Sequence, residues 1–99
     1  MGFIQTIEVQ AADGSALAEH LAAWHAEQHG IAPGYRGYRL LADRDRPGRF
    51  TILVDFTSAD ETDANDARPE TAAWAARLSE LTTAAPSFAN FDSLAESGR

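Results

Sequence analysis

The stretch that decides the fold is RFTILVDF, which occupies residues 49–56. Successive side chains of an extended strand point to opposite sides. Every second residue here is large and apolar, so one side of the strand carries Phe50, Ile52, Val54 and Phe56. We interpret this row as the face of a strand that lies against helices.

The segments around this strand predict one pattern of strands and helices. We expect further strands at 3–9, 35–42 and 88–94, helices at 15–30 and 69–84, and a short helix that begins near Ser58. The turn-rich residues 43–48 join two of these strands into a hairpin. The resulting order is that of the split βαβ unit, so we predict an α+β, ferredoxin-like βαββαβ domain with an antiparallel sheet.

Each long predicted helix has one inward side. In the first helix, the helical period of about 100° per residue groups Leu17, Leu21, Trp24, Gln28 and Ile31. In the second it groups Thr71, Trp74, Ala75, Leu78, Leu81 and Thr82. Two helices cover one face of a sheet, so we expect the other face to need a partner or a ligand to complete the core.

Composition limits the function classes. Residues 1–99 suit a single domain, with 93–99 as a frayed tail. The formal charge is −7 and the arginines form no run, so we expect neither a nucleic acid nor an anionic membrane as partner. There is no cysteine, no signal-peptide pattern in residues 1–10 and no apolar stretch of membrane-spanning length. We therefore expect a cytoplasmic protein.

The run HAEQH at residues 25–29 carries the most reactive side chains. His25 and His29 share a helix face and form a weak candidate pair for a metal, but no third ligand is obvious. Solvated histidines are the simpler interpretation. His25 lies beside the apolar stripe, which favours it as a base or hydrogen-bond donor in a pocket. Gln28 falls within the stripe, either near solvent at the helix end or as an amide that faces a ligand.

Four aromatic residues are candidates for the wall of a pocket. Trp24 and Trp74 lie on the inward sides of their helices, where large aromatic side chains usually belong to the core. In a fold with an open pocket they also line it, and Tyr38 and Phe56 can join them. Such a pocket suits a flat, apolar ligand.

The remaining groups of polar residues and glycines predict no site. We interpret Asp60, Glu61, Asp63 and Asp66 as acids that interact with the dipole at the start of a helix. No serine lies in a nucleophile-elbow context, and the glycines form no phosphate-binding loop.

Several short segments resemble the antibiotic biosynthesis monooxygenase family. They are FTSADE (56–61), NDARPET (65–71) and APSF (85–88), and the hairpin ADRDRPGR (42–49) resembles uncharacterised actinobacterial members. The resemblance covers roughly residues 2–94. It implies a homodimeric α/β barrel in which two ferredoxin-like subunits pack sheet against sheet, each with a pocket between its sheet and helices.

The family includes oxygenases that need no cofactor and act on aromatic polyketides or quinols, and others that degrade heme. The heme-degrading members use an Asn on the first strand, a Trp at the end of the third and a His on the second long helix. Here Phe56 stands at the Trp position, and residues 3–9 and 69–84 contain neither the Asn nor the His. These departures argue against heme degradation. Polyketide oxygenases also favour a Trp where Phe56 stands.

Asn65 and Arg68 match the family's Asn-x-x-x-Pro junction before Pro69. One interpretation is a structural turn. The other is a binding site in which Arg68 holds a ligand carboxylate or enolate.

Three functions follow as hypotheses. The first is a monooxygenase without cofactor, with His25 as base and a substrate site formed by Trp24, Gln28, Tyr38, Phe56, Asn65, Arg68 and Trp74. The second is a non-oxygenase member that uses the same pocket as a ligand-binding protein, cyclase or isomerase. The third is a dimeric protein without catalytic activity.

Overall fold

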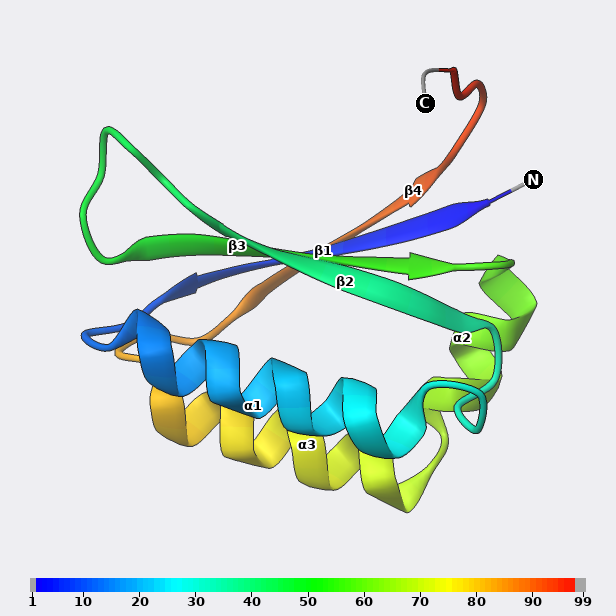
Figure 1. Cartoon of the computed structure of the whole chain (residues 1–99), viewed down its shortest axis with the longest axis horizontal. Helices are drawn as coiled ribbons and strands as arrows, with labels where there is room; N and C mark the ends of the chain where they lie inside the picture. The colour runs from blue at the N-terminus through cyan, green and yellow to red at the C-terminus, as the bar shows by residue number, and fades with distance from the viewer. Residues whose placement is uncertain (1, 98–99) are drawn as a thin grey trace.

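The computed structural model describes residues 2–97 and contains four strands and three helices within that range (Figure 1). In chain order they are β1 (Phe3–Gln10), α1 (Gly14–Gln28), β2 (Tyr35–Ala42), β3 (Arg49–Phe56), α2 (Ala59–Asp66), α3 (Pro69–Leu81) and β4 (Ser87–Asp92). The order confirms the predicted α+β, ferredoxin-like fold, with α2 as a short helix before α3.

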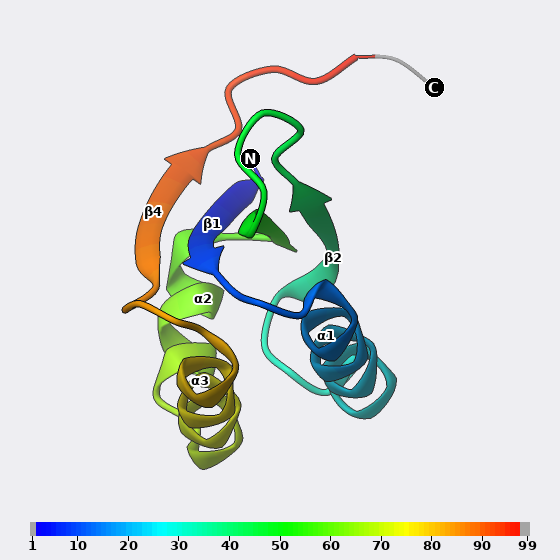
Figure 2. The same cartoon turned by 90° about the vertical axis from the view of Figure 1, so that its left-hand side faces the viewer.

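The sheet has the strand order β2-β3-β1-β4, and each neighbouring pair is antiparallel. The register pairs Phe3 with Phe56 and Ile7 with Ile52, so the two central strands place their apolar rows on the same face. Helices α1 and α3 both lie on that face (Figures 1 and 2). The opposite face carries no helix of residues 2–97.

The core forms where the row of β3 meets the helices. Ile52, Val54 and Phe56 are buried as the sequence predicts, and Phe50 is half-buried at the edge of the cluster. Ile7, Leu17, Leu21 and Leu78 complete the most deeply buried set.

Side-chain caps explain where two helices begin. The Asp13 carboxylate accepts a hydrogen bond from Ser15 N at 2.9 Å, and Ser58 Oγ accepts one from Glu61 N at 3.2 Å. Pro69 occupies the start of α3, where its missing N–H removes no helical hydrogen bond. The predicted starts of a short helix near Ser58 and of a second helix at residue 69 are confirmed.

Three predicted boundaries are wrong. Helix α1 ends at Gln28, and Gly30 then adopts a φ of 89°, so Ile31 leaves the inward stripe and is 68% exposed. Helix α3 ends at Leu81 because Thr82 is extended and Thr83 N donates to Gln10 O at 2.7 Å. Strand β4 runs from 87 to 92 rather than 88 to 94. Of the predicted tail 93–99, residues 93–97 form no helix or strand, and 98–99 lie outside the described residues.

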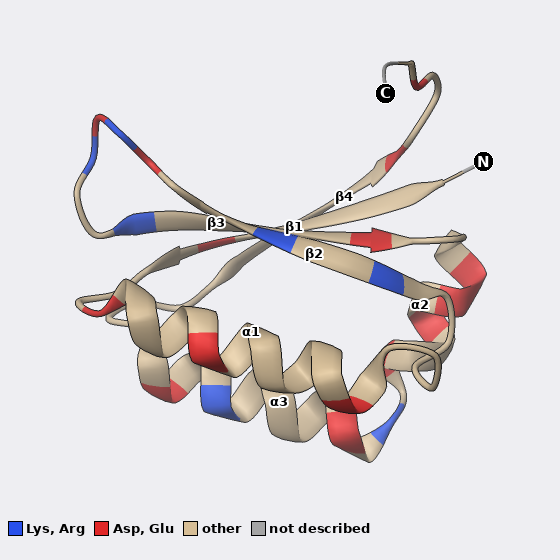
Figure 3. Ribbon diagram, in the orientation of Figure 1, with Lys and Arg blue, Asp and Glu red and all other residues tan. Residues whose placement is uncertain are grey.

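Charged residues are distributed unevenly over the elements. Figure 3 shows acidic residues on α1, α2 and α3, whereas β2 and the loop to β3 carry several arginines, with acidic residues also in that loop. Two of these arginines have acidic neighbours: Arg46 pairs with Asp43 at 2.8 Å and Arg36 approaches Asp55 to 4.0 Å. Within residues 2–97, no helix is both long enough and apolar enough to cross a membrane.

Candidate functional site

A cavity of about 400 Å³ lies between the sheet and the helices. Its wall is mostly apolar, and its six aromatic members are Trp24, Tyr35, Tyr38, Phe56, Trp74 and Phe88. The polar members are Gln5, Asn65, Asp66 and Thr71, besides the two tyrosines. A cavity of this size and character suits a small aromatic molecule.

The two tryptophans form one side of this cavity and leave it open. Their ring centroids are 5.8 Å apart with planes tilted by 53°, and both side chains are half-buried. A second hollow of about 340 Å³ between α1 and α3 is also lined by Trp24 and Trp74. The two tryptophans therefore lie between the cavity and this second hollow.

Trp74 also carries an unsatisfied polar group. Its Nε1–H is buried and has no hydrogen-bond partner among the described residues. On the other side of the ring, His20 stacks at 5.2 Å and its Nε2 lies 3.0 Å from the backbone oxygen of Trp74. A buried donor without an acceptor costs about 1–3 kcal/mol, so an acceptor that reached Nε1 would stabilise the protein.

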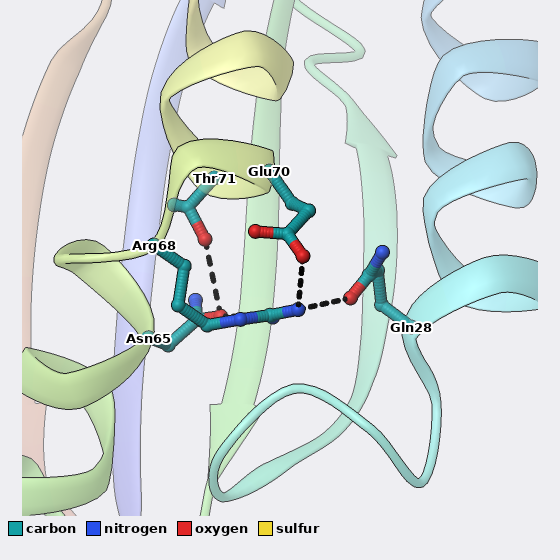
Figure 4. A network of polar contacts seen from close by, with 5 residues as sticks. All are labelled: Gln28, Asn65, Arg68, Glu70 and Thr71. Atoms are coloured by element: carbon teal, nitrogen blue, oxygen red, sulfur yellow. Dashed lines mark hydrogen bonds and ion pairs between the residues drawn. The ribbon is translucent and has the colours of Figure 1, made fainter.

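A polar network fixes the orientation of Asn65, the last buried residue of α2 (Figure 4). Its Oδ1 accepts a hydrogen bond from Arg68 Nη1 at 3.2 Å and another from Thr71 Oγ1 at 3.1 Å. The other end of the guanidinium donates from Nη2 to Gln28 Oε1 at 2.9 Å and to Glu70 Oε2 at 3.2 Å. The network thus connects the end of α1 to the junction of α2 and α3.

The network leaves the amide nitrogen of Asn65 without an acceptor in the described part of the chain. Because both hydrogen bonds reach Oδ1, Nδ2 and its two N–H groups are left for other acceptors. No group among residues 2–97 accepts a hydrogen bond from Nδ2. Asn65 is 4% exposed and lines the cavity, so its amide can offer N–H donors to an oxygen atom inside it.

Gln28 and Arg68 lie one layer behind the cavity wall. Neither residue belongs to its lining. Gln28 is 9% exposed and satisfied by Arg68, which excludes the interpretation of an amide near solvent at the helix end. The structure therefore places both residues where they hold Asn65, and direct contact between either of them and a ligand stays a prediction.

His25 also lies outside the cavity lining. Its Nδ1 is 2.8 Å from the Tyr35 hydroxyl, and its ring meets the rings of Tyr35 and Tyr38, both of which line the cavity. This arrangement does not favour a direct contact between His25 and a ligand. The imidazole is connected to the cavity through the side chain of Tyr35.

The His25 and His29 rings stack at 4.7 Å with planes 24° apart. Nitrogen lone pairs lie in the ring plane, so two stacked rings do not direct them at one ion. No group of three or more His, Cys, Asp or Glu side chains in residues 2–97 is placed to hold a metal.

Sequence reasoning did not assign Tyr35 or Asp66 to the site, although it did assign Tyr38. Tyr35 and Tyr38 both face the helices because the pairing of β2 with β3 shifts between Tyr35 and Gly37, and strict alternation would not place them on one side. Asp66 is the last residue of α2 rather than an acid at its start, so the interpretation as a favourable dipole contact is wrong for it. Burial against the cavity, and then the Asp63 charge, raise the pKa of Asp66 above its usual value.

Solved structures share this fold across nearly the whole chain. SnoaB, a cofactor-independent oxygenase from Streptomyces nogalater, has a TM-score of 0.74 at 20% identity, over 96% of this chain and 95% of its own. Rv0793 from Mycobacterium tuberculosis has a TM-score of 0.76 at 20% identity, over 99% and 100%. A conserved protein from Methanosarcina mazei has a TM-score of 0.71 at 14% identity, over 92% and 91%. At these identities the likeness shows the fold alone.

A search of curated protein sequences gave no match. The family model described as antibiotic biosynthesis monooxygenase matches residues 2–77, which include β1 to β3, α2 and most of α3. The matched region contains every cavity residue except Phe88. The chain belongs to the antibiotic biosynthesis monooxygenase family.

Proposed function

We propose that this protein binds a flat, electron-rich aromatic molecule in its cavity and oxygenates it without a cofactor. The observation that supports this most is the combination of an aromatic wall with the amide donor of Asn65. Family membership and the fold shared with SnoaB, a cofactor-independent oxygenase, also support it. The substrate class is a phenol, quinol or anthrone.

The chemistry needs a dry pocket and a proton acceptor. Loss of a proton makes the aromatic ring electron-rich enough to give an electron to O₂. The substrate radical and superoxide then combine to a peroxide anion, which takes back the proton to become a hydroperoxide. When the oxidised carbon is a CH₂, the hydroperoxide loses water. One oxygen atom of O₂ then becomes a carbonyl and the other leaves as water with the two hydrogen atoms of that carbon.

In this proposal Asn65 stabilises the anion that forms on the substrate oxygen. Its N–H groups are held in place before the reaction, so they stabilise new negative charge without reorganising. Gln28 and Arg68 hold the amide, Trp24, Trp74, Tyr38 and Phe56 contact the rings, and His25 accepts the proton.

The experiment fills the cavity from α3. Ala75 lines it, whereas the neighbouring Ala76 is exposed and lies outside the lining. We expect anthrone or quinol to quench the tryptophan fluorescence of the wild type and to drive O₂ uptake. Ala75→Phe should abolish both signals, and Ala76→Phe should keep both. Equal behaviour of the two variants would show that the cavity is not the site.

The same cavity also suits the alternative of a binding protein, cyclase or isomerase. Ligand binding that Ala75→Phe abolishes, without O₂ uptake by the wild type, would select this alternative. Absence of binding for every aromatic class tested would select a protein without catalytic activity.

We further propose a homodimer formed through the free face of the sheet. Ile4 and Leu53 point to that face and are half-buried in the single chain, and Leu41 and Phe91 are 43% and 52% exposed on it. A second copy would cover these side chains. Sedimentation at micromolar concentration tests this, and the mass of one chain would refute the barrel. Cytoplasmic localisation, the single domain and the actinobacterial type stay predictions.

A further inference from the structure

Tyr35 connects the cavity to His25. It is the first residue of β2, is 6% exposed and lines the cavity with its ring packed edge-on against Trp24 and Phe56. Its hydroxyl lies 2.8 Å from His25 Nδ1. The Tyr35 side chain therefore contacts both the cavity and His25, a titratable residue outside it.

His25 provides the outer end of this connection. It lies in the last turn of α1, is half-buried, and stacks on His29, which is exposed. The titratable groups that meet its ring among the described residues are His29 from the same helix and Tyr35 and Tyr38 from β2. Because His25 is only half-buried, a proton on its imidazole can exchange with water.

We propose that Tyr35 and His25 together accept the proton of a phenolic ligand, with Tyr35 as the residue that touches it. This rests on the proposed function, because it assigns the proton acceptor of that same cavity. The ligand O–H bond breaks and its proton bonds to Tyr35 Oη, while the proton of Tyr35 passes to His25 Nδ1. The products are a bound phenolate, a neutral tyrosine and an imidazolium, so charge and atoms balance.

The two residues need each other for this role. Burial, and then the Tyr38 charge, raise the pKa of Tyr35 to about 12, so the hydroxyl does not ionise by itself near neutral pH. An imidazole ordinarily titrates near neutral pH, but this one does not line the cavity. Proton transfer through the Tyr35 hydroxyl combines the position of Tyr35 at the cavity with the basicity of the His25 imidazole.

Asp66 is the competing acceptor. It lines the cavity directly and is the one carboxylate that does so among the described residues. Asp66 is an exposed residue, however, whereas Tyr35 is 6% exposed. A test of the pair must therefore include a variant at Asp66.

The experiment uses 4-nitrophenol, whose anion absorbs at longer wavelength than the neutral phenol, and follows binding and ionisation separately. Calorimetry reports binding, and absorbance against pH reports the pKa of the bound dye. We expect the wild type to lower that pKa by about one unit, which is a tenfold change in the ionisation constant. Histidine NMR should show one imidazole gaining a proton as the dye binds, with the resonance assigned by its loss in His25→Gln.

The variants separate the proton transfer from structure. His25→Gln keeps an acceptor for the Tyr35 hydroxyl but removes the base, and Tyr35→Phe keeps the ring but removes the hydroxyl. Both should bind the dye and lose its pKa shift. His29→Gln is the matched control on the same helix and should keep the shift.

Each other outcome contradicts the proposal in a recognisable way. A dye that does not bind to the wild type refutes both the aromatic cavity function and the pair. A bound dye whose pKa is unchanged, or stays lowered in His25→Gln and Tyr35→Phe, refutes the pair and leaves the cavity function intact. Loss of the shift in Asp66→Asn alone assigns the proton to Asp66.

Discussion

Asn65 and Tyr35 both line the cavity, and both are connected to a residue of the last turn of α1. Gln28 reaches Asn65 through Arg68, whereas His25 contacts Tyr35 directly. The difference is in what the partner can do. Arg68 keeps its charge at any ordinary pH, but an imidazole gains and loses protons near neutral pH. One contact therefore fixes a dipole, and the other can move a proton.

The largest effect should come from removing the fixed dipole. Asn65→Asp keeps the shape and still accepts from Arg68 and Thr71, but it replaces the N–H donors with an oxygen. We expect turnover of an anthrone or quinol to fall about 10²–10³-fold at pH values where the new carboxyl group is ionised, because one donor to a developing oxyanion contributes that much.

The shape of the pH profile distinguishes the two roles. Loss of the proton acceptor in His25→Gln should remove a pH-dependent limb of turnover, whereas Asn65→Leu, which removes the N–H donors and adds no titratable group, should lower the whole curve. Asp60→Asn, an exposed change on the same helix and outside the cavity lining, serves as a control and should match the wild type. A profile that changes shape in Asn65→Leu would contradict the assignment of a fixed dipole to Asn65.

A smaller effect should follow from loosening the network behind Asn65. Arg68→Lys keeps the charge but cannot bond to Asn65, Gln28 and Glu70 together. We expect the free energy of unfolding to fall by about 1–3 kcal/mol, because Gln28 and Asn65 are buried and lose a partner. Urea denaturation measures this.

The matched control is Arg77→Lys on α3, whose pair with Glu80 at 2.9 Å is largely exposed. It should change stability by less than about 0.5 kcal/mol. We expect turnover of Arg68→Lys to fall about tenfold, less than for Asn65→Asp, since the donors remain but are less well oriented. Equal stability of the two arginine variants would show that the network does not hold the junction.

The strands and helices around Asn65 and Tyr35 can be predicted from the sequence more fully than the contacts of these two residues. Alternation in 49–56 and the turn at 43–48 predict β3 and the hairpin because they depend on neighbouring residues. The run 25–29 predicts His25 and Gln28 as residues that touch a ligand, and this stays a prediction. Their actual partners, Tyr35 and Arg68, are 10 and 40 residues away, and local periodicity does not report such contacts. Tyr35 was missed because a shift in strand pairing breaks the alternation that would have revealed its face.

The smallest effect needs no substrate and isolates Tyr35. The chain has two tyrosines, no lysine and no cysteine, so its spectrum above pH 9 reports tyrosine ionisation almost alone. We expect one step near pH 12, which belongs to Tyr35 and disappears in Tyr35→Phe. Tyr38→Phe should retain it.

The sign of the accompanying stability change follows from the same shift. The pKa of Tyr35 rises from 10.0 in the unfolded chain to about 12 in the folded one, so the folded state keeps the proton between these values. Its contribution to stability is complete below pH 10 and is lost as the pH rises toward 12. The melting temperature of the wild type should therefore fall more steeply across this range than that of Tyr35→Phe. Equal slopes would mean that the hydroxyl is hydrated in the folded state, and a hydrated hydroxyl would exchange its proton with water instead of passing it to His25.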